Sequence, residues 1–364
     1  MLNQRALAAS LGISQSTVAR ALRGSTLVNP ETRQRIELAA RKIGYRPNPL
    51  VSTLMAHIRS GKNIHDQGVI AILVDTPSVA IHSASPVYRA QHEGMQKRAL
   101  SLGYTTEVFS IRNKENTDAV LDKMLYSRGI VGVILAAPVN VARTSLLKNE
   151  LKLKWERYAF ATISYDWQSP QIDRATANHR RNVDIAYHEL LARGYTRIGL
   201  SLPPSALNSN DSNWLSGYMV SQYYRPPETH IPLFVSSQTA PCEGFRDWYQ
   251  RWKPDALLCL IGEELEWMKA IGLSPLRDMA LVCLNRPTDS HFSGVDEDNV
   301  FVGETACNIV VDQITHNTRG IPERPRLILV DGKWTEGETL PSRKPSSTPK
   351  KRSLAAWAPE KSIK

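Results

Sequence analysis

The sequence predicts an all-α headpiece at the N-terminus, followed by an α/β body built from two parallel sheets. Three observations predict this. Residues 1–60 place apolar residues at helical spacing, with short breaks between the runs. Residues 68–340 alternate short apolar runs, typical of buried strands, with helical patterns. The length of 364 residues exceeds one ordinary core, so we expect several domains.

The composition excludes several classes of protein. The hydrophobic fraction of 42% and the charged fraction of 22% are close to globular averages, which excludes a wholly disordered or fibrous chain. No run approaches the roughly 18 apolar residues of a membrane helix, and no secretory signal follows Met1. The four cysteines contain no Cys-x-x-Cys pair, so we expect no metal centre, no cofactor and no disulfide framework. This cysteine usage fits a reducing cytoplasm.

Positive charge is concentrated at the two ends of the chain. Residues 1–60 hold nine Lys and Arg against two acids, and residues 341–364 hold seven against one. The remaining residues hold 29 against 32, which accounts for the net charge of +10. A basic end can follow the phosphate backbone of nucleic acid. For residues 341–364 we favour the simpler interpretation of a solubilising tail.

A helix-turn-helix is predicted at the start of the chain. Asn3 caps a first helix that ends at Gly12, and Ser14 caps a second helix. In the spacing Ala8, Gly12, Val18, a small residue lets the helices approach, a glycine allows the turn, and a branched side chain fills the gap. The predicted inward positions are Leu7, Ala8, Leu11, Val18, Ala21 and Leu22. Without a DNA-binding role, the same pattern would describe a plain helical bundle.

Two further helices complete the headpiece. Pro30 and Glu31 mark the start of a third helix, which Gly44 ends. Its predicted inward positions are Ile36, Leu38, Ala39 and Ile43. Asn48 and Pro49 open a short fourth helix that needs a partner to be stable. Its apolar positions are Leu50, Leu54, Met55 and Ile58.

These segments resemble the DNA-binding headpiece of the lactose/galactose repressor (LacI/GalR) family. The resemblance lies in residues 8–14, 16–22, 29–33 and 43–48. It implies that Gln15, Ser16 and Arg20 contact bases in the major groove. It also implies that residues 48–60 form a hinge helix, in which Leu54 is a minor-groove wedge. The chain departs from the usual pattern at Ala6, where the family usually has Asp.

The chemistry of these side chains suits those roles. Arg20 can pair with guanine O6 and N7, and Gln15 can pair with adenine N6 and N7. An apolar wedge unstacks one base step and bends the duplex, although Leu54 could also pack against its dimer mate. Arg23, where the family usually has Asn, adds charge near the phosphates. The expected phosphate contacts are Ser14, Thr17, Arg23, Thr32, Tyr45 and Asn48.

The body resembles the core domain of the same family. The resemblance rests on residues 85–88 with Gly94, on residues 186–199, and on Val295 with Gly303 and Ala306. It implies the periplasmic-binding-protein type I fold, which has two doubly wound lobes with an effector site between them. The domains that we predict are a headpiece at 1–47, a hinge helix at 48–60, a linker at 61–67, a core at 68–340 and a disordered basic tail at 341–364. The first lobe would take about 68–165 and 287–321, and the second about 166–286 and 322–340.

The family's effector positions hold aromatic and amide residues in this chain. Trp214 stands where the family often has Arg, and Asn285 stands where it often has Asp. The effector contacts implied by the resemblance are Ser85, Pro86, Tyr88, Tyr165, Trp167, Trp214 and Asn285. Aromatic faces and amides favour a sugar, because sugar C–H faces stack and hydroxyls need donors and acceptors. Ordinary packing between lobes would explain the same aromatic residues.

The leading hypothesis is a homodimeric transcriptional regulator, of the repressor type, that binds a pseudo-palindromic operator. A small effector would control it. No dinucleotide fingerprint, phosphate loop or nucleophile elbow is present, so we expect no enzyme. The alternatives are a DNA-binding regulator whose cleft no longer binds ligand and, less favoured, a solute-binding receptor of the same core fold.

Overall fold

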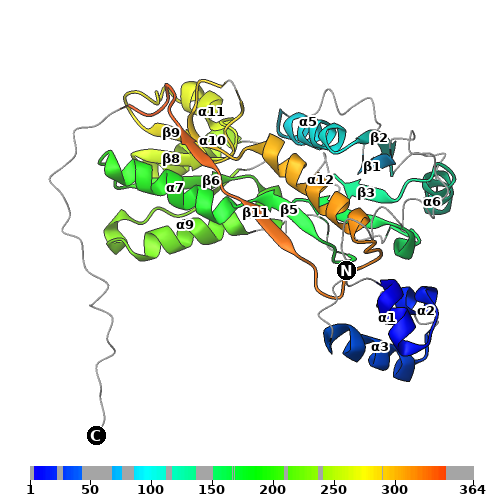
Figure 1. Ribbon diagram of the computed structural model, residues 1–364. Coiled ribbons are helices and arrows are strands. Elements are labelled where there is room, and N and C mark those ends of the chain that lie inside the picture. The colour runs from blue at the N-terminus through cyan, green and yellow to red at the C-terminus, as the bar shows by residue number, and fades with distance from the viewer. Residues whose placement is uncertain are drawn as a thin grey trace, which may run out of the picture. The chain divides into compact units, whose positions relative to one another are not determined.

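The computed structural model describes most of the chain, and the chain divides into two units, Met1–Asp66 and Gln67–Lys364 (Figure 1). The described residues are 4–22, 28–42, 68–75, 86–111, 117–136, 151–165, 167, 169–208, 212–236, 241–288 and 290–341. Within them, no helix is long and apolar enough to cross a membrane. The expected fourth helix at 48–60 and the expected tail from residue 342 onward lie outside the described residues.

The first unit contains the predicted helix-turn-helix. Its helices are α1 (Gln4–Leu11), α2 (Gln15–Ala21) and α3 (Pro30–Lys42). Gly12 adopts φ +66°, a left-handed conformation that glycine takes without strain, between α1 and α2. The side chains of its core are Leu7, Ala8, Val18, Ala21, Val28, Ile36 and Ala40. The prediction for Leu38 was wrong, because Ile36 and Ala40 share one face of α3 and Leu38 lies 59% exposed.

The first lobe of the second unit is a six-stranded sheet in the order β11-β5-β4-β3-β1-β2. Every neighbouring pair in it is parallel. Its strands are β1 (Gly68–Val74), β2 (Tyr104–Ser110), β3 (Gly132–Leu135), β4 (Ala159–Ile163), β5 (Arg174–Ala177) and β11 (Leu327–Val330). Its helices are α5 (Pro86–Ser101), α6 (Asp118–Ser127) and α12 (Asn299–Thr315), with a short 3-10 helix at Trp155–Arg157.

The second lobe is another six-stranded sheet, in the order β12-β10-β9-β8-β6-β7. Its strands are β6 (Ile198–Leu202), β7 (Phe234–Val235), β8 (Ala256–Cys259), β9 (Ala280–Cys283), β10 (Ser293–Asp296) and β12 (Lys333–Thr335). Only β12 runs antiparallel to its neighbour. Its helices are α7 (His179–Ala192), α8 (Pro204–Asn208), α9 (Asn213–Tyr223), α10 (Pro241–Trp252) and α11 (Glu264–Ala270), with a 3-10 helix at Pro227–Thr229.

The chain crosses between the lobes three times, and each crossing comes later than the sequence analysis placed it. β5 joins the first sheet beside β4, so the first crossing follows Ala177 rather than residue 165. β10 joins the second sheet, so the second crossing follows Asp296 rather than residue 286. β11 returns to the first sheet, so the third crossing follows Val330 rather than residue 321. Strand pairing alone decides the sheet to which each short strand belongs.

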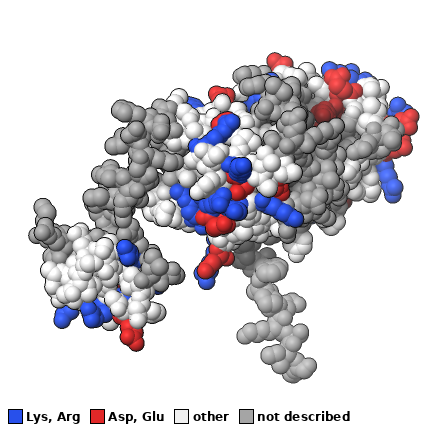
Figure 2. Space-filling view, turned by 90° about the vertical axis from the view of Figure 1, so that its right-hand side faces the viewer, with Lys and Arg blue, Asp and Glu red and all other residues white. Residues whose placement is uncertain are grey.

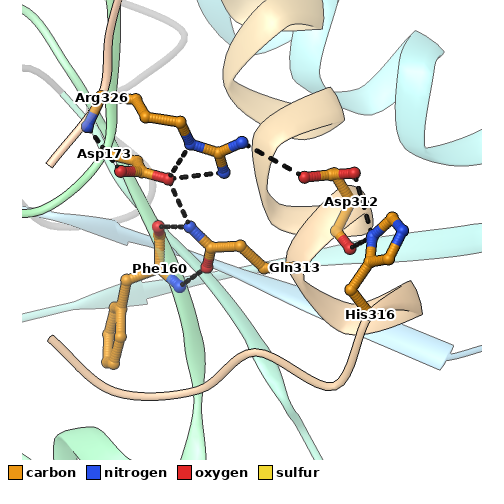
Figure 3. Close-up of polar contacts among 6 residues, drawn as sticks. All are labelled: Phe160, Asp173, Asp312, Gln313, His316 and Arg326. Atoms are coloured by element: carbon orange, nitrogen blue, oxygen red, sulfur yellow. Dashed lines mark hydrogen bonds and ion pairs between the residues drawn. The ribbon is translucent and has the colours of Figure 1, made fainter. Parts of the chain in front are cut away.

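A buried polar network attaches α12 to the first sheet (Figure 3). Gln313 accepts from the Phe160 amide at 2.8 Å and donates to the Phe160 carbonyl at 3.0 Å, so it bonds the β4 backbone as a neighbouring strand would. The same amide nitrogen donates to Asp173 at 3.0 Å. Arg326 reaches Asp173 at 2.7 Å and Asp312 of α12 at 3.4 Å. The network therefore connects α12 with the entries to β5 and β11.

Candidate functional site

The exposed face of α2 carries the predicted base contacts. Gln15, Ser16 and Arg20 are all exposed to solvent. Ser14 caps the helix, since its Oγ accepts from the Thr17 amide at 3.1 Å. The Ser14 hydroxyl also lies 2.8 Å from that of Ser16. The helix is therefore held at its first turn, with long polar side chains facing solvent.

The predicted phosphate contacts are only partly described. Thr17 and Thr32 are half-buried at the starts of α2 and α3, and Ser14 is exposed. Arg23, Leu54, Tyr45 and Asn48 lie outside the described residues. Figure 2 shows basic side chains on the surface of the first unit, and the described ones that are exposed include Arg20, Arg35 and Lys42. Exposed cations of this kind are suited to contacts with phosphate.

A second candidate site lies where the lobes face each other. β5 ends at Ala177, and α7 of the second lobe begins at His179. In the opposite direction, β10 ends at Asp296, and α12 of the first lobe begins at Asn299. Both parallel sheets therefore turn the carboxyl ends of their strands toward the other lobe, which is where open α/β sheets bind ligands. We call this region the inter-lobe edge.

An aromatic stack occupies the inter-lobe edge. The indole of Trp214, at the start of α9, lies over the His179 imidazole with ring centroids 3.9 Å apart and 17° between planes. The Tyr165 ring centroid lies 6.3 Å from that of His179, and the Arg174 guanidinium lies 5.8 Å from the Tyr165 ring. Tyr165 directly follows Ser164, whose φ of +70° turns the chain at the end of β4. The structure thus brings two predicted residues, Tyr165 and Trp214, to the same imidazole.

Three amide side chains form a row that joins the two lobes. Gln91 of α5 donates to Asn299 Oδ1 at 2.9 Å, and Asn299 donates to Asn285 Oδ1 at 3.2 Å. Asn285 follows β9 of the second lobe, whereas Gln91 and Asn299 belong to the first. The predicted residue Asn285 is therefore part of a polar contact between lobes. Amide groups of this kind can donate to, and accept from, hydroxyl groups of a ligand.

The other predicted effector contacts lie elsewhere or are not described. Ser85 lies outside the described residues, and Pro86 is exposed at the first position of α5. Tyr88 is half-buried against the core of the first lobe. Trp167 is only 5% exposed and packs in the other apolar cluster of that lobe, with Tyr158 and Phe160. Its carbonyl accepts from Arg174 at 2.9 Å, which holds it there.

Sequence reasoning missed His179, Gln91, Glu297 and Asn299. Glu297 and His179 are side chains with little exposure, 2% and 11%, and their Oε1 and Nε2 atoms lie 3.7 Å apart. Asn178, the N-cap of α7, was the available signal, because its side chain accepts from the Arg181 amide at 3.3 Å. The preceding strand, β5, contains Arg and Thr instead of a continuous apolar run, so it was not predicted. Without that strand, Asn178 could not be recognised as the start of a helix at the end of the sheet.

One buried acid lies near the same end of the second sheet. Glu264, the first residue of α11, is 5% exposed. Burial raises the pKa of its carboxyl group above the ordinary value for glutamate. Within the described residues, no cluster of His, Cys, Asp and Glu could hold a metal ion. The inter-lobe edge combines aromatic and amide groups with the His179–Glu297 pair.

Comparison with known families decides the identity of the headpiece. Residues 6–48 match the profile described as bacterial regulatory proteins, lacI family. The matched segment contains α2 and its exposed face. The headpiece belongs to the lacI family. The chain is therefore related to bacterial regulatory proteins.

Two curated relatives illustrate how far the similarity to the lacI family extends. The chain is 25% identical over 199 residues to the HTH-type transcriptional regulator MalR of Streptomyces coelicolor, a match that covers 54% of this chain and 53% of that protein. The match thus spans about half the length of that relative. It is 22% identical over 341 residues to the HTH-type transcriptional repressor PurR of Klebsiella pneumoniae, which covers 87% of this chain and 92% of that repressor.

Two solved structures share the two-lobed fold. The transcriptional regulator CelR in complex with cellobiose matches with a TM-score of 0.56 and 16% identity, covering 93% of this chain and 100% of that one. The lac repressor dimer bound to operator and an anti-inducer matches with a TM-score of 0.51 and 17% identity, covering 93% and 98%. At these identities the likeness concerns the fold alone.

Proposed function

We propose that this protein is a sequence-specific transcriptional regulator, of the repressor type, that binds operator DNA as a homodimer in the cytoplasm. The observation that carries the proposal is the helix-turn-helix within residues 6–48, whose second helix exposes Gln15 and Arg20 beside a capped N-terminus. Two such headpieces would contact successive major grooves of a pseudo-palindrome. The lac repressor dimer bound to operator shares this fold, which supports the proposal.

In the proposed complex, one group of headpiece side chains contacts bases and a second group contacts phosphates. Arg20 and Gln15 would select guanine and adenine through bidentate hydrogen bonds, with Ser16 between them. Ser14, Thr17, Thr32 and the basic residues would hold the phosphates and determine the register. Residues 48–60 would form a hinge helix that inserts Leu54 into the minor groove, a proposal that concerns residues outside the described part.

A neutral sugar is the effector that we propose for the inter-lobe edge. The Trp214–His179 stack offers an aromatic face for sugar C–H groups, and the Gln91–Asn299–Asn285 row offers amides for hydroxyls. Trp214 and Asn285 carry no charge, whereas the family often has Arg and Asp at these positions. These two positions therefore offer no cation to an anionic ligand. CelR in complex with cellobiose shares this fold. Coupling between effector and operator in such systems is about 1–3 kcal/mol.

A second candidate is a regulator that needs no effector. It is favoured by the fact that Trp214 already stacks on His179 and that Asn285 already accepts from Asn299. The ring face of Trp214 and the Oδ1 atom of Asn285 are therefore already in contact with other side chains of the protein. A ligand would have to replace those contacts and offer better ones.

Selection from random duplex DNA at physiological salt tests the main proposal. An enriched pseudo-palindrome is expected, and binding that is salt-sensitive without any enriched sequence would contradict sequence-specific recognition. Thermal unfolding with a panel of neutral sugars that includes cellobiose then separates the two effector candidates. A rise in Tm with one sugar supports the first, since a ligand stabilises the state that it binds. No rise with any sugar would favour the effector-free regulator.

A further inference from the structure

The three crossovers between the lobes meet in a polar cluster that is buried at Asn182, Glu297 and Gly332. We call Asn178, Asn182, Glu297, Asp331 and Gly332 the crossover cluster. The Asn182 side chain donates to Glu297 Oε1 at 2.8 Å and accepts from the Gly332 amide at 3.1 Å. The Asn178 side chain donates to Asp331 Oδ1 at 2.7 Å. Residues 178 and 182 belong to the first crossing, 297 to the second, and 331 and 332 to the third, so side chains bond all three together.

Backbone packing at Gly332 makes this junction tight. A Cβ atom placed there would lie 2.7 Å from Asn182 Oδ1 and 2.9 Å from the Asp296 carbonyl oxygen. Asn182 is fully buried and Glu297 is 2% exposed, so solvent does not compete for their hydrogen bonds. A shift of one crossover therefore has to be accommodated by the other two.

His179 connects the crossover cluster with the aromatic stack. Its ring packs on Trp214 at 3.9 Å, and its Nε2 lies 3.7 Å from Glu297 Oε1. The helices α9 and α7 pack closely beside the indole, because a Cβ added at Gly217, one turn further along α9, would lie only 3.0 Å from the Arg180 carbonyl oxygen. Trp214, His179 and Glu297 thus form a continuous path from the inter-lobe edge to the crossovers.

We infer that His179 is a positioning residue that transmits effector binding at Trp214 to the three crossovers. The inference rests on the proposed function for the place where the effector binds. A ligand against the indole displaces the imidazole at the first position of α7. The preceding residue, Asn178, both caps α7 and bonds Asp331, so the displacement reaches the third crossing and changes the angle between the lobes.

A packing role for His179 makes a different prediction. If the imidazole only fills space, its loss lowers the stability of the second lobe as a whole. If it transmits a displacement, changes at Trp214 reach the Gly332 amide only while His179 is present. The two roles are separated by a double-mutant cycle that is read out at Gly332.

The experiment measures hydrogen exchange of the Gly332 amide in the full-length protein, without DNA or sugar. The variants are Trp214→Ala, His179→Ala and the double variant. Each single variant is expected to accelerate exchange of the Gly332 amide about fivefold. This factor corresponds to the loss of about one hydrogen bond's net contribution to stability. The double variant is expected to be no faster than His179→Ala alone. His179→Phe, which keeps a ring against the indole, should restore much of the protection.

His188→Ala is the matched control, because His188 is an exposed histidine on the same helix, whose Nδ1 lies 2.7 Å from the Asp184 carbonyl. It should leave Gly332 exchange unchanged. Additive effects of the two single variants, or no effect of Trp214→Ala at Gly332, would overturn the inference. If the effects of Trp214→Ala and His179→Ala are non-additive but no sugar raises the Tm, the coupling through His179 is supported and the proposed sugar effector is contradicted.

Discussion

The crossing of α5 and α12 gives the sharpest test of the packing in this fold. Gly94 and Gly303 let the two helices touch through their backbones. A Cβ on Gly303 would lie 2.0 Å from the Gln91 carbonyl oxygen, and a Cβ on Gly94 would lie 1.9 Å from the Val300 carbonyl oxygen. Both obstacles are backbone atoms, which no side-chain rotation can move. The helices would have to separate by about 1 Å to accept either methyl group.

The expected cost of Gly303→Ala follows from two opposing effects. Overpacking a close-packed interior costs about 1–3 kcal/mol, and a backbone obstacle places this site near the upper end. Replacing glycine by alanine inside a helix recovers about 1 kcal/mol of helix propensity. The free energy of unfolding should therefore fall by about 2 kcal/mol. The same shift would displace Asn299 at the start of α12, and with it the contact to Asn285.

Gly244→Ala is the matched control for this prediction. Gly244 lies within α10, is exposed, and has nothing closer than a Phe234 ring carbon at 3.8 Å from its added Cβ. The identical substitution should stabilise the protein by about 0.5–1 kcal/mol. Urea unfolding followed by circular dichroism measures both variants. Equal effects of the two substitutions, or a stabilised Gly303→Ala protein, would refute the close approach of α5 and α12.

Three further outcomes are expected. Gln313→Ala leaves the Phe160 amide and carbonyl without their side-chain hydrogen bonds, so the free energy of unfolding measured in urea should fall by about 2–3 kcal/mol. The control His316→Ala, at an exposed residue, should change it by less than about 0.5 kcal/mol. Similar losses in both variants would contradict the stabilising role of the Gln313 network. Burial raises the pKa of Glu264 in the folded protein, so its ionisation costs stability from the ordinary glutamate pKa upward. Glu264→Gln should therefore gain stability relative to the parent as pH rises above about 4, and a stability difference that stays constant with pH would refute this. Arg20→Ala should weaken operator binding by about 1–3 kcal/mol and relax selectivity at one base pair in a repeated selection; uniform weakening would assign Arg20 to phosphate.

Local patterns were sufficient for the headpiece. Ala8, Gly12 and Val18 predict a turn and a helix crossing from residues that lie within a few positions of each other. The structure confirms Gly12 as the left-handed turn residue and Val18 as core. Leu38 shows the limit of this reasoning, because a periodic apolar residue still needs a partner surface to be buried.

The inter-lobe edge was only partly predictable. Tyr165, Trp214 and Asn285 could be named from their resemblance to family positions, and all three lie there. His179 and Glu297 could not be named, because the Asn178 cap marks only the start of a helix and does not show which side chains meet there. They become neighbours only when the first and second crossings meet.

The sequence by itself determined the helix-turn-helix, the alternation of strands and helices, and the family. These features depend on hydrophobic periodicity, caps and turn residues, which act over a few positions along the chain. Only the tertiary structure decided which sheet each of β5, β10 and β11 joins, and hence where the chain crosses between lobes. Strand pairing is a long-range choice, in which hydrogen bonds form between segments far apart in sequence. The burial of Trp167, and the meeting of His179 with Trp214 and Glu297, follow from that choice.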